Sequence, residues 1–121
     1  MKESQELRVI DANIILRFLV NDLPEQAGCC VKLLKRLEAG AEQVLLPDLV
    51  LADIVWMMEK FYKLSKREIR DIMASVLALR GLQFSSKAVA REAFQLYIEK
   101  NIDWTDAFVF SQMMSNFILG N

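Results

Sequence analysis

The sequence contains no histidine among its 121 residues. This absence excludes the side chain that most often acts as a general base near neutral pH, and it excludes imidazole as a metal ligand. Any bound metal ion would therefore be a hard cation held by oxygen atoms.

The sequence also lacks a strong net charge, because 15 Lys and Arg residues nearly balance 16 Asp and Glu residues and leave a formal net charge of −1. No global field attracts nucleic acid, so a basic binding site would have to be local. No apolar run reaches the roughly 18 residues that a membrane-spanning helix needs. The charged segment 1–6 does not resemble a signal peptide, and we expect a cytoplasmic protein with no membrane partner.

Only two cysteines are present, Cys29 and Cys30, and they are adjacent. They fall in a stretch with helical spacing, where neighbouring side chains point in different directions, so a disulfide between them is not expected. Two cysteines without a paired spacing suit a reducing compartment. We interpret both as ordinary packing residues.

Hydrophobic residues are abundant, at 54% of the chain, and they form short runs separated by segments of helical spacing. The length suits one domain, over residues 1–121. Strands that alternate with helices favour an α/β fold with a parallel sheet covered on both faces. The expected strands are 7–10, 44–46 and 82–84, and the expected helices are 14–20, about 24–39, 49–63, 65–80, 87–99 and 105–117.

Several helix boundaries carry capping signals. Ser65 and Glu68 have the spacing of a capping box, in which each side chain bonds to a backbone N–H group of the other residue. The other expected boundary residues are Gly40, Asp48, Gly81, Ser85 or Ser86, and Asp103.

An acid follows the first expected strand in Val9-Ile10-Asp11-Ala12-Asn13. Asp11 would then lie at the carboxyl end of a strand, which is the edge where open α/β sheets bind ligands. A carboxylate there has two interpretations, a turn or helix cap and a metal ligand. Asp11 alone does not decide between them.

A second acid, Asp53, interrupts the 49–63 helix, which is apolar almost all round and is therefore expected to be buried. A buried carboxylate is costly unless it is paired or bound to a metal ion. The alternative, which the sequence supports about equally, is a partly exposed position facing a Lys or Arg.

Two further acids, Asp103 and Asp106, are three residues apart at the start of the last expected helix and so share one face. A cap and a first-turn acid explain them without a ligand. Asp106 nevertheless precedes the run 107–110, which is apolar and expected to be buried, and this favours a ligand role.

Three elements thus each offer an acid: Asp11, Asp53, and Asp106 with Asp103. Like-charged carboxylates gather closely only around a cation. Oxygen ligands suit Mg²⁺ or Mn²⁺, which can lower the pKa of a bound water and stabilise charge on a phosphate. The predicted reaction is hydrolysis of a phosphodiester.

Phosphate contacts would come from local cations, and we name Arg17, Lys35 and Arg36 as candidate substrate-binding residues. Arg17 is the strongest because it follows Asp11 closely. A further basic cluster comprises Lys60, Lys63, Lys66 and Arg67. For each of these side chains, an ordinary solvated helix face is the alternative.

Three segments together resemble the PIN domain family and, within it, the VapC-like toxins. They are Val9-Ile10-Asp11-Ala12-Asn13-Ile14-Ile15-Leu16, Leu46-Pro47 with Val50-Leu51-Ala52-Asp53-Ile54-Val55-Trp56, and Asp103-Trp104-Thr105-Asp106-Ala107. The resemblance implies a three-layer α/β/α fold with a short central parallel sheet. It also implies an Mg²⁺- or Mn²⁺-dependent endoribonuclease acting as the toxin of a toxin–antitoxin pair, often a homodimer and often inhibited by a small antitoxin protein.

The resemblance assigns Asp11, Asp53 and Asp106 to the acidic site, and Asn13 and Thr105 to polar positions that support it. Two departures follow. The family usually has Glu at the position of Asp53, and a carboxylate shorter by one methylene group would reach the metal through water. The family also continues into another strand with a fourth acid, which would begin near the end of this sequence. The chain is then truncated, or that acid is absent, or Asp103 replaces it.

These departures favour a second hypothesis, a PIN-like module that binds RNA or protein and has an inactive metal site. A third hypothesis, a phosphatase of another doubly wound fold, would need a second Asp two residues after Asp11. Asn13 occupies that place and argues against it.

Overall fold

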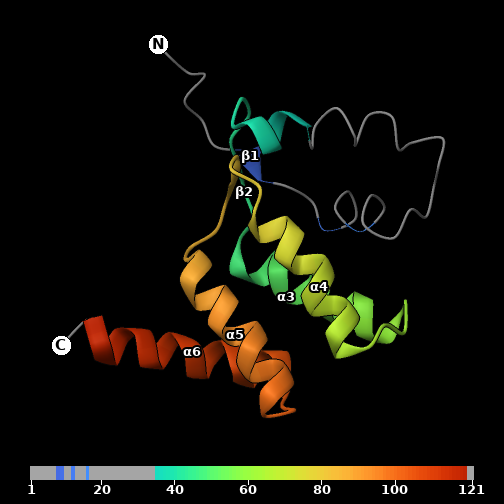
Figure 1. The fold of residues 1–121 in the computed structure, drawn as a ribbon, viewed down its shortest axis with the longest axis vertical. Helices are drawn as coiled ribbons and strands as arrows, with labels where there is room; N and C mark the ends of the chain where they lie inside the picture. The colour runs from blue at the N-terminus through green and yellow to red at the C-terminus, as the bar shows by residue number, and fades with distance from the viewer. Residues whose placement is uncertain (1–7, 10–11, 13–15, 17–34, 120–121) are drawn as a thin grey trace. The chain divides into compact units, whose positions relative to one another are not determined.

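The computed structural model describes residues 8–9, 12, 16 and 35–119, and within these it has an α/β fold with a short parallel sheet (Figure 1). Residues 35–39 are also helical. The elements are β1 (Arg8–Val9), β2 (Val44–Leu45), α3 (Asp48–Lys60), α4 (Lys66–Leu77), β3 (Leu82–Gln83), α5 (Lys87–Glu99) and α6 (Trp104–Leu119).

Some of the elements and site residues predicted from the sequence lie outside the described residues. The expected helix 14–20 and most of the helix 24–39 are among them, as are Asp11, Asn13, Arg17, Cys29 and Cys30. No described helix is both long enough and apolar enough to cross a membrane.

The sheet contains three strands in the order β1-β2-β3, and both pairs are parallel. Arg8 is opposite Val44, and Val44 is opposite Leu82. The predicted parallel sheet is therefore confirmed, although β2 and β3 are each two residues long and thus shorter than the sequence indicated.

The chain forms two compact units. Unit 1 comprises Met1–Ile54 and Ala78–Ser85, and unit 2 comprises Val55–Leu77 and Ser86–Asn121. Unit 1 contains the sheet, and the apolar residues Val44 and Leu82 of its strands and Leu46, just after β2, are buried. Unit 2 contains α4, α5 and α6, and α5 packs against both of the others (Figure 1).

Two glycines shape the turn that precedes β2 in unit 1. Gly40 has φ +80°, and the N–H groups of Gly40 and Ala41 donate to the carbonyls of Leu37 and Arg36. This pairing is a Schellman cap, which confirms Gly40 as the end of the helix. Gly81 has a different role, because a Cβ there would lie 1.9 Å from the Glu42 carbonyl oxygen.

Asp48 lies at the start of α3, just after β2. Its expected role as the helix cap is wrong, because the first helical hydrogen bond runs from the Leu51 N–H to the Pro47 carbonyl and Asp48 is already helical. The Ser85 hydroxyl, which follows β3, donates to Asp48 Oδ1 at 2.5 Å. Asp48 and Ser85 thus join the chain segments that leave two neighbouring strands.

The predicted burial of α3 on all sides is also wrong. The buried residues Leu51, Ile54, Val55 and Met58 follow helical spacing and form a single stripe. On the other side of the helix, Leu49 is 83% exposed and Trp56 is 57% exposed. Apolar residues occur on every face of α3, but only one face of the helix is buried.

The helix starts of unit 2 follow the predicted capping chemistry. The Ser65 N–H donates to Glu68 Oε1 at 2.8 Å, and the Glu68 N–H donates to Ser65 Oγ at 3.2 Å. Ser86 caps α5 by accepting from the Val89 N–H. The helix α4 ends at Leu77, so Gly81 does not terminate it as expected.

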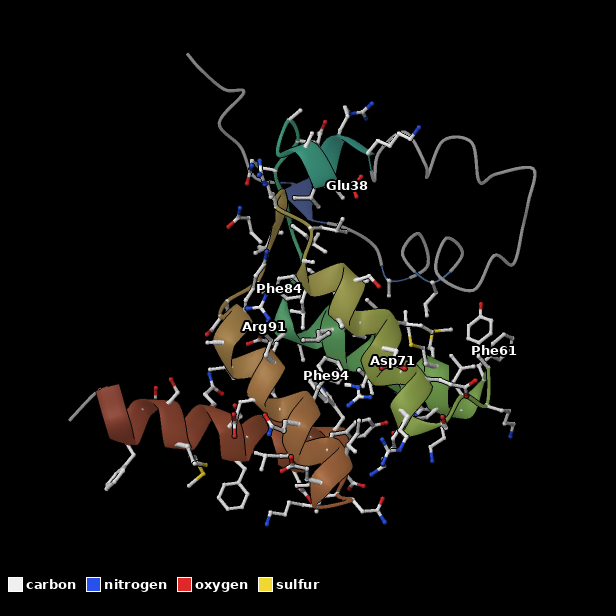
Figure 2. All side chains as sticks on the ribbon, viewed as in Figure 1. Glu38, Phe61, Asp71, Phe84, Arg91 and Phe94 are labelled. Carbon is white, nitrogen blue, oxygen red and sulfur yellow. The ribbon has the colours of Figure 1, made fainter. Side chains whose placement is uncertain are left out.

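Aromatic side chains fill the contact between α5 and α6. Trp104 lies 4.2 Å from Phe94 and 5.9 Å from Tyr97, measured between ring centroids. Phe94 projects from the middle of α5 (Figure 2), and it also lines a small hollow with Ala74 and Leu77 of α4. Further along α6, the buried Ser111 hydroxyl donates to the Val89 carbonyl at 2.8 Å. The Trp104 contacts hold the first turn of α6 against α5, and the Ser111 bond holds the middle of α6 against α5.

Candidate acidic turn at the start of helix α6

The candidate site in unit 2 is the connection from α5 to α6. After the α5 cap at Lys100, Asn101 takes the left-handed conformation with φ 51°. Asp103 then precedes α6, and its carbonyl accepts the N–H of Ala107 at 2.9 Å. The backbone therefore reverses within a few residues and presents the start of α6.

The side chains of this connection fall into a buried group and an exposed group. Trp104 and Ala107 are buried, whereas Asp103, Thr105 and Asp106 are exposed. The structure thus brings three of the predicted site residues together on one exposed helical turn, which we call the acidic turn. Positive charge at a helix start favours carboxylates there.

The rest of α6 differs from the prediction. The run that follows Asp106 is only partly buried, with Val109 and Phe110 both exposed. The exposed apolar residues continue to Phe117. The helix itself runs to Leu119, so residues 118–119 are helical where a strand was expected to begin.

Lys66, the first residue of α4, contacts the same connection. Its ammonium group donates to the Ile102 carbonyl at 2.7 Å and to the Tyr97 carbonyl at 3.3 Å. The ammonium also lies 4.4 Å from the centroid of the Tyr97 ring, in a cation–π contact. Lys66 belongs to the basic cluster noted in the sequence, but its ammonium group is bonded to backbone carbonyls.

Tyr97 is fully buried and its hydroxyl donates to the Glu59 carboxylate. Burial, the hydrogen bond to Glu59 and the negative charges of Glu59 and Asp103 all raise the pKa of Tyr97 above its ordinary value. Neutral Tyr97 is therefore favoured in the folded state.

This shift predicts a loss of stability in alkali. Because the unfolded chain releases the Tyr97 proton near pH ~10, the free energy of unfolding should fall as the pH rises above that value. Urea unfolding across this range should show a smaller fall for Tyr97→Phe than for wild type. In a Tyr62→Phe background, tyrosinate absorbance that appears near pH ~10 without unfolding would contradict the prediction.

Asp53 lies in α3, within unit 1, and its side chain is exposed. Helical spacing places it on the face opposite the buried stripe, near Leu49 and Trp56. Of the two alternatives for Asp53, the buried one is wrong and the exposed one is right about exposure, but no Lys or Arg among residues 35–119 forms an ion pair with Asp53. Exposure leaves its carboxylate accessible to solvent.

The candidate phosphate contacts differ in their surroundings. Lys35 and Arg36 are both exposed. The Arg36 Nε atom donates to Glu42 Oε1 at 3.1 Å, so an acid already holds this guanidinium. The assignment of Lys35 as a phosphate contact stays a prediction.

The donor chemistry of the acidic turn fits a hard divalent cation, because Asp103 and Asp106 offer carboxylate oxygens that are accessible to solvent. Within the described part of the chain, no three His, Cys, Asp or Glu side chains lie close enough together to hold a metal ion. Asp11, the acid that follows β1, is outside that part.

The sequence profile of the PIN domain matches residues 8–117. The chain belongs to the PIN domain family, whose members are generally nucleases that use divalent metal ions.

Among curated proteins, the chain is similar to a VapC ribonuclease of Aquifex aeolicus (strain VF5). The two are 22% identical over 100 residues, which cover 83% of this chain and 73% of that protein. No solved structure matches the chain.

Proposed function

We propose that this protein is a divalent-metal-dependent endoribonuclease that hydrolyses RNA phosphodiester bonds. The observation that supports this most is the match of the PIN domain to residues 8–117, within which the acidic turn presents Asp103 and Asp106 to solvent. The similarity to a VapC ribonuclease supports RNA as the substrate. We take residues 1–121 as a single PIN-like domain.

In this proposal, Asp11, Asp53 and Asp106 would hold Mg²⁺ or Mn²⁺, with Asp103 as an additional ligand. Such an ion, when bound, lowers the pKa of a ligated water and stabilises negative charge on the phosphate. Asp53 is one methylene group shorter than Glu and would act through a water molecule. Asn13 and Thr105 would orient the acids, and Arg17, Lys35 and Arg36 would contact the RNA backbone.

The proposal predicts that cleavage of RNA by the purified protein requires Mg²⁺ or Mn²⁺ and stops when EDTA is added. Asp11→Asn should reduce the rate by about 100-fold, because one charge-stabilising group is lost. Asp71→Asn is the matched control, since Asp71 is an exposed acid on α4 that pairs with Arg70. Gel assays with a labelled RNA would measure both rates.

The same assay distinguishes the metal-dependent nuclease from the alternative, a binding module with an inactive metal site. Cleavage that persists in EDTA and in Asp11→Asn would overturn the metal-dependent proposal. RNA binding without cleavage in either metal would favour the binding module with an inactive site.

We further propose that the protein acts as the toxin of a toxin–antitoxin pair and forms a homodimer. The exposed apolar residues of α6, which end at Phe117 with 84% exposure, would be covered by a protein partner. Light scattering of the purified protein tests the homodimer, and co-expression with the product of an adjacent small gene tests the antitoxin.

A further inference from the structure

One lysine side chain joins the end of α5 to the start of α6, and this contact bears on the acidic turn. The Lys66 ammonium has three N–H donors. Two of them reach carbonyls on either side of the connection, at Tyr97 and at Ile102. The residue after Ile102 is Asp103, so the shorter of the two bonds acts on the peptide group that leads directly into the acidic turn.

The Tyr97 carbonyl needs this partner. It lies in the last turn of α5, where carbonyl groups have no helical N–H to accept from. The neighbouring carbonyls of Leu96 and Ile98 accept N–H groups at the cap, from Lys100 and Asn101. Lys66 supplies the donor for Tyr97, and its positive charge suits the negative end of the helix.

The surroundings fix Lys66 as well. Its ammonium rests on the Tyr97 ring, and that ring is held by the hydroxyl contact to Glu59 and by the packing of Trp104. The connection also contains Asn101 in the left-handed conformation, which Asn adopts more readily than other residues with a side chain.

We propose that Lys66 is a positioning residue for the acidic turn, and that it sets the direction in which Asp103 and Asp106 present their carboxylates to a divalent cation. Lys66 itself touches neither the cation nor the RNA. This inference rests on the proposed function, because it assigns the acidic turn to cation binding.

The test compares Lys66→Met, which keeps the length of the stem and removes the donors, with Lys66→Arg, which keeps the charge and the donors. Lys100→Met is the charge control, since Lys100 is exposed at the same end of α5. Mn²⁺ affinity is measured by electron paramagnetic resonance well below the melting temperature of each variant. RNA cleavage is measured as a function of Mn²⁺ concentration.

We expect Lys66→Met to weaken Mn²⁺ binding by about 10-fold or more, as for other residues that orient metal ligands. Cleavage should fall at low Mn²⁺ and recover at saturating Mn²⁺, with KM for RNA unchanged. Lys66→Arg should recover most of the affinity, and Lys100→Met should match wild type. Hydrogen exchange of the Ala107 amide, which bonds to the Asp103 carbonyl, should be faster in Lys66→Met only.

The outcomes separate the two proposals. A wild-type protein that neither binds Mn²⁺ nor cleaves RNA overturns the proposed function, and exchange at Ala107 then still decides whether Lys66 holds the turn. An active wild type beside a folded Lys66→Met variant with equal Mn²⁺ affinity overturns the Lys66 proposal alone. If Lys66→Met does not fold, Lys66→Gln replaces it, because its amide retains a donor and should give an intermediate affinity.

Discussion

Replacing Asp106 by Asn should reduce RNA cleavage by about 100-fold while leaving the protein folded. The substitution preserves shape and removes one negative charge from the group we assign to the cation, and loss of a single preorganised charged group typically has an effect of this size. Asp106 is exposed in the first turn of α6, so its charge stabilises the helix by only about 0.3–1 kcal/mol. Single-turnover cleavage and thermal unfolding would measure the two effects separately.

Asp103→Asn provides the comparison within the same turn. Asn is as good a cap as Asp, so the melting temperature should not change. Because Asp103 is an additional ligand in our proposal, the rate should fall less than in Asp106→Asn, by about 10-fold. An Asp106→Asn protein that keeps more than a tenth of the wild-type rate would exclude Asp106 from the metal site.

Gly81→Ala should cause the largest loss of stability among single substitutions of the described glycines. The new Cβ would lie 1.9 Å from the Glu42 carbonyl oxygen and 3.0 Å from Leu37 Cα, and both are backbone atoms. The Gly81 N–H and carbonyl are also bonded to Leu37 and Val44. We expect a loss of about 3 kcal/mol or more, which would lower the melting temperature by roughly 10 °C.

Gly40→Ala is the matched control, because its cost has a different origin. A Cβ at Gly40 would meet only Arg80 side-chain atoms at 3.7 Å, an ordinary contact. The left-handed backbone alone should then cost about 1–2 kcal/mol. Equal losses for the two alanine variants in urea unfolding would show that the close approach at Gly81 relaxes freely.

The features that sequence reasoning predicted best depend on neighbouring residues. The Ser65–Glu68 capping box, the Ser86 cap and the Gly40 Schellman cap each rest on chemistry within a few positions. The acidic turn belongs to the same group, since a spacing of three at a helix start places Asp103 and Asp106 on one side whatever the rest of the chain does.

The features it missed depend on contacts between distant parts of the chain. The composition of α3 did not reveal which side is buried, so the exposure of Trp56 was not predicted and the choice between a buried and an exposed Asp53 stayed open. Lys66 was missed because its partners are carbonyls, and every residue type has one. The sequence therefore does not distinguish a lysine that donates to backbone carbonyls from a lysine that faces solvent.

The sheet and the acidic turn should also form at different times during folding. Arg8 pairs with Val44, and Val44 with Leu82, so each strand pairing closes a long loop and loses chain entropy before it gains contacts. The packing of α5 on α6 joins residues that are close in sequence, and local contacts of this kind form faster. We infer that a folding chain carries a formed acidic turn before its sheet is complete.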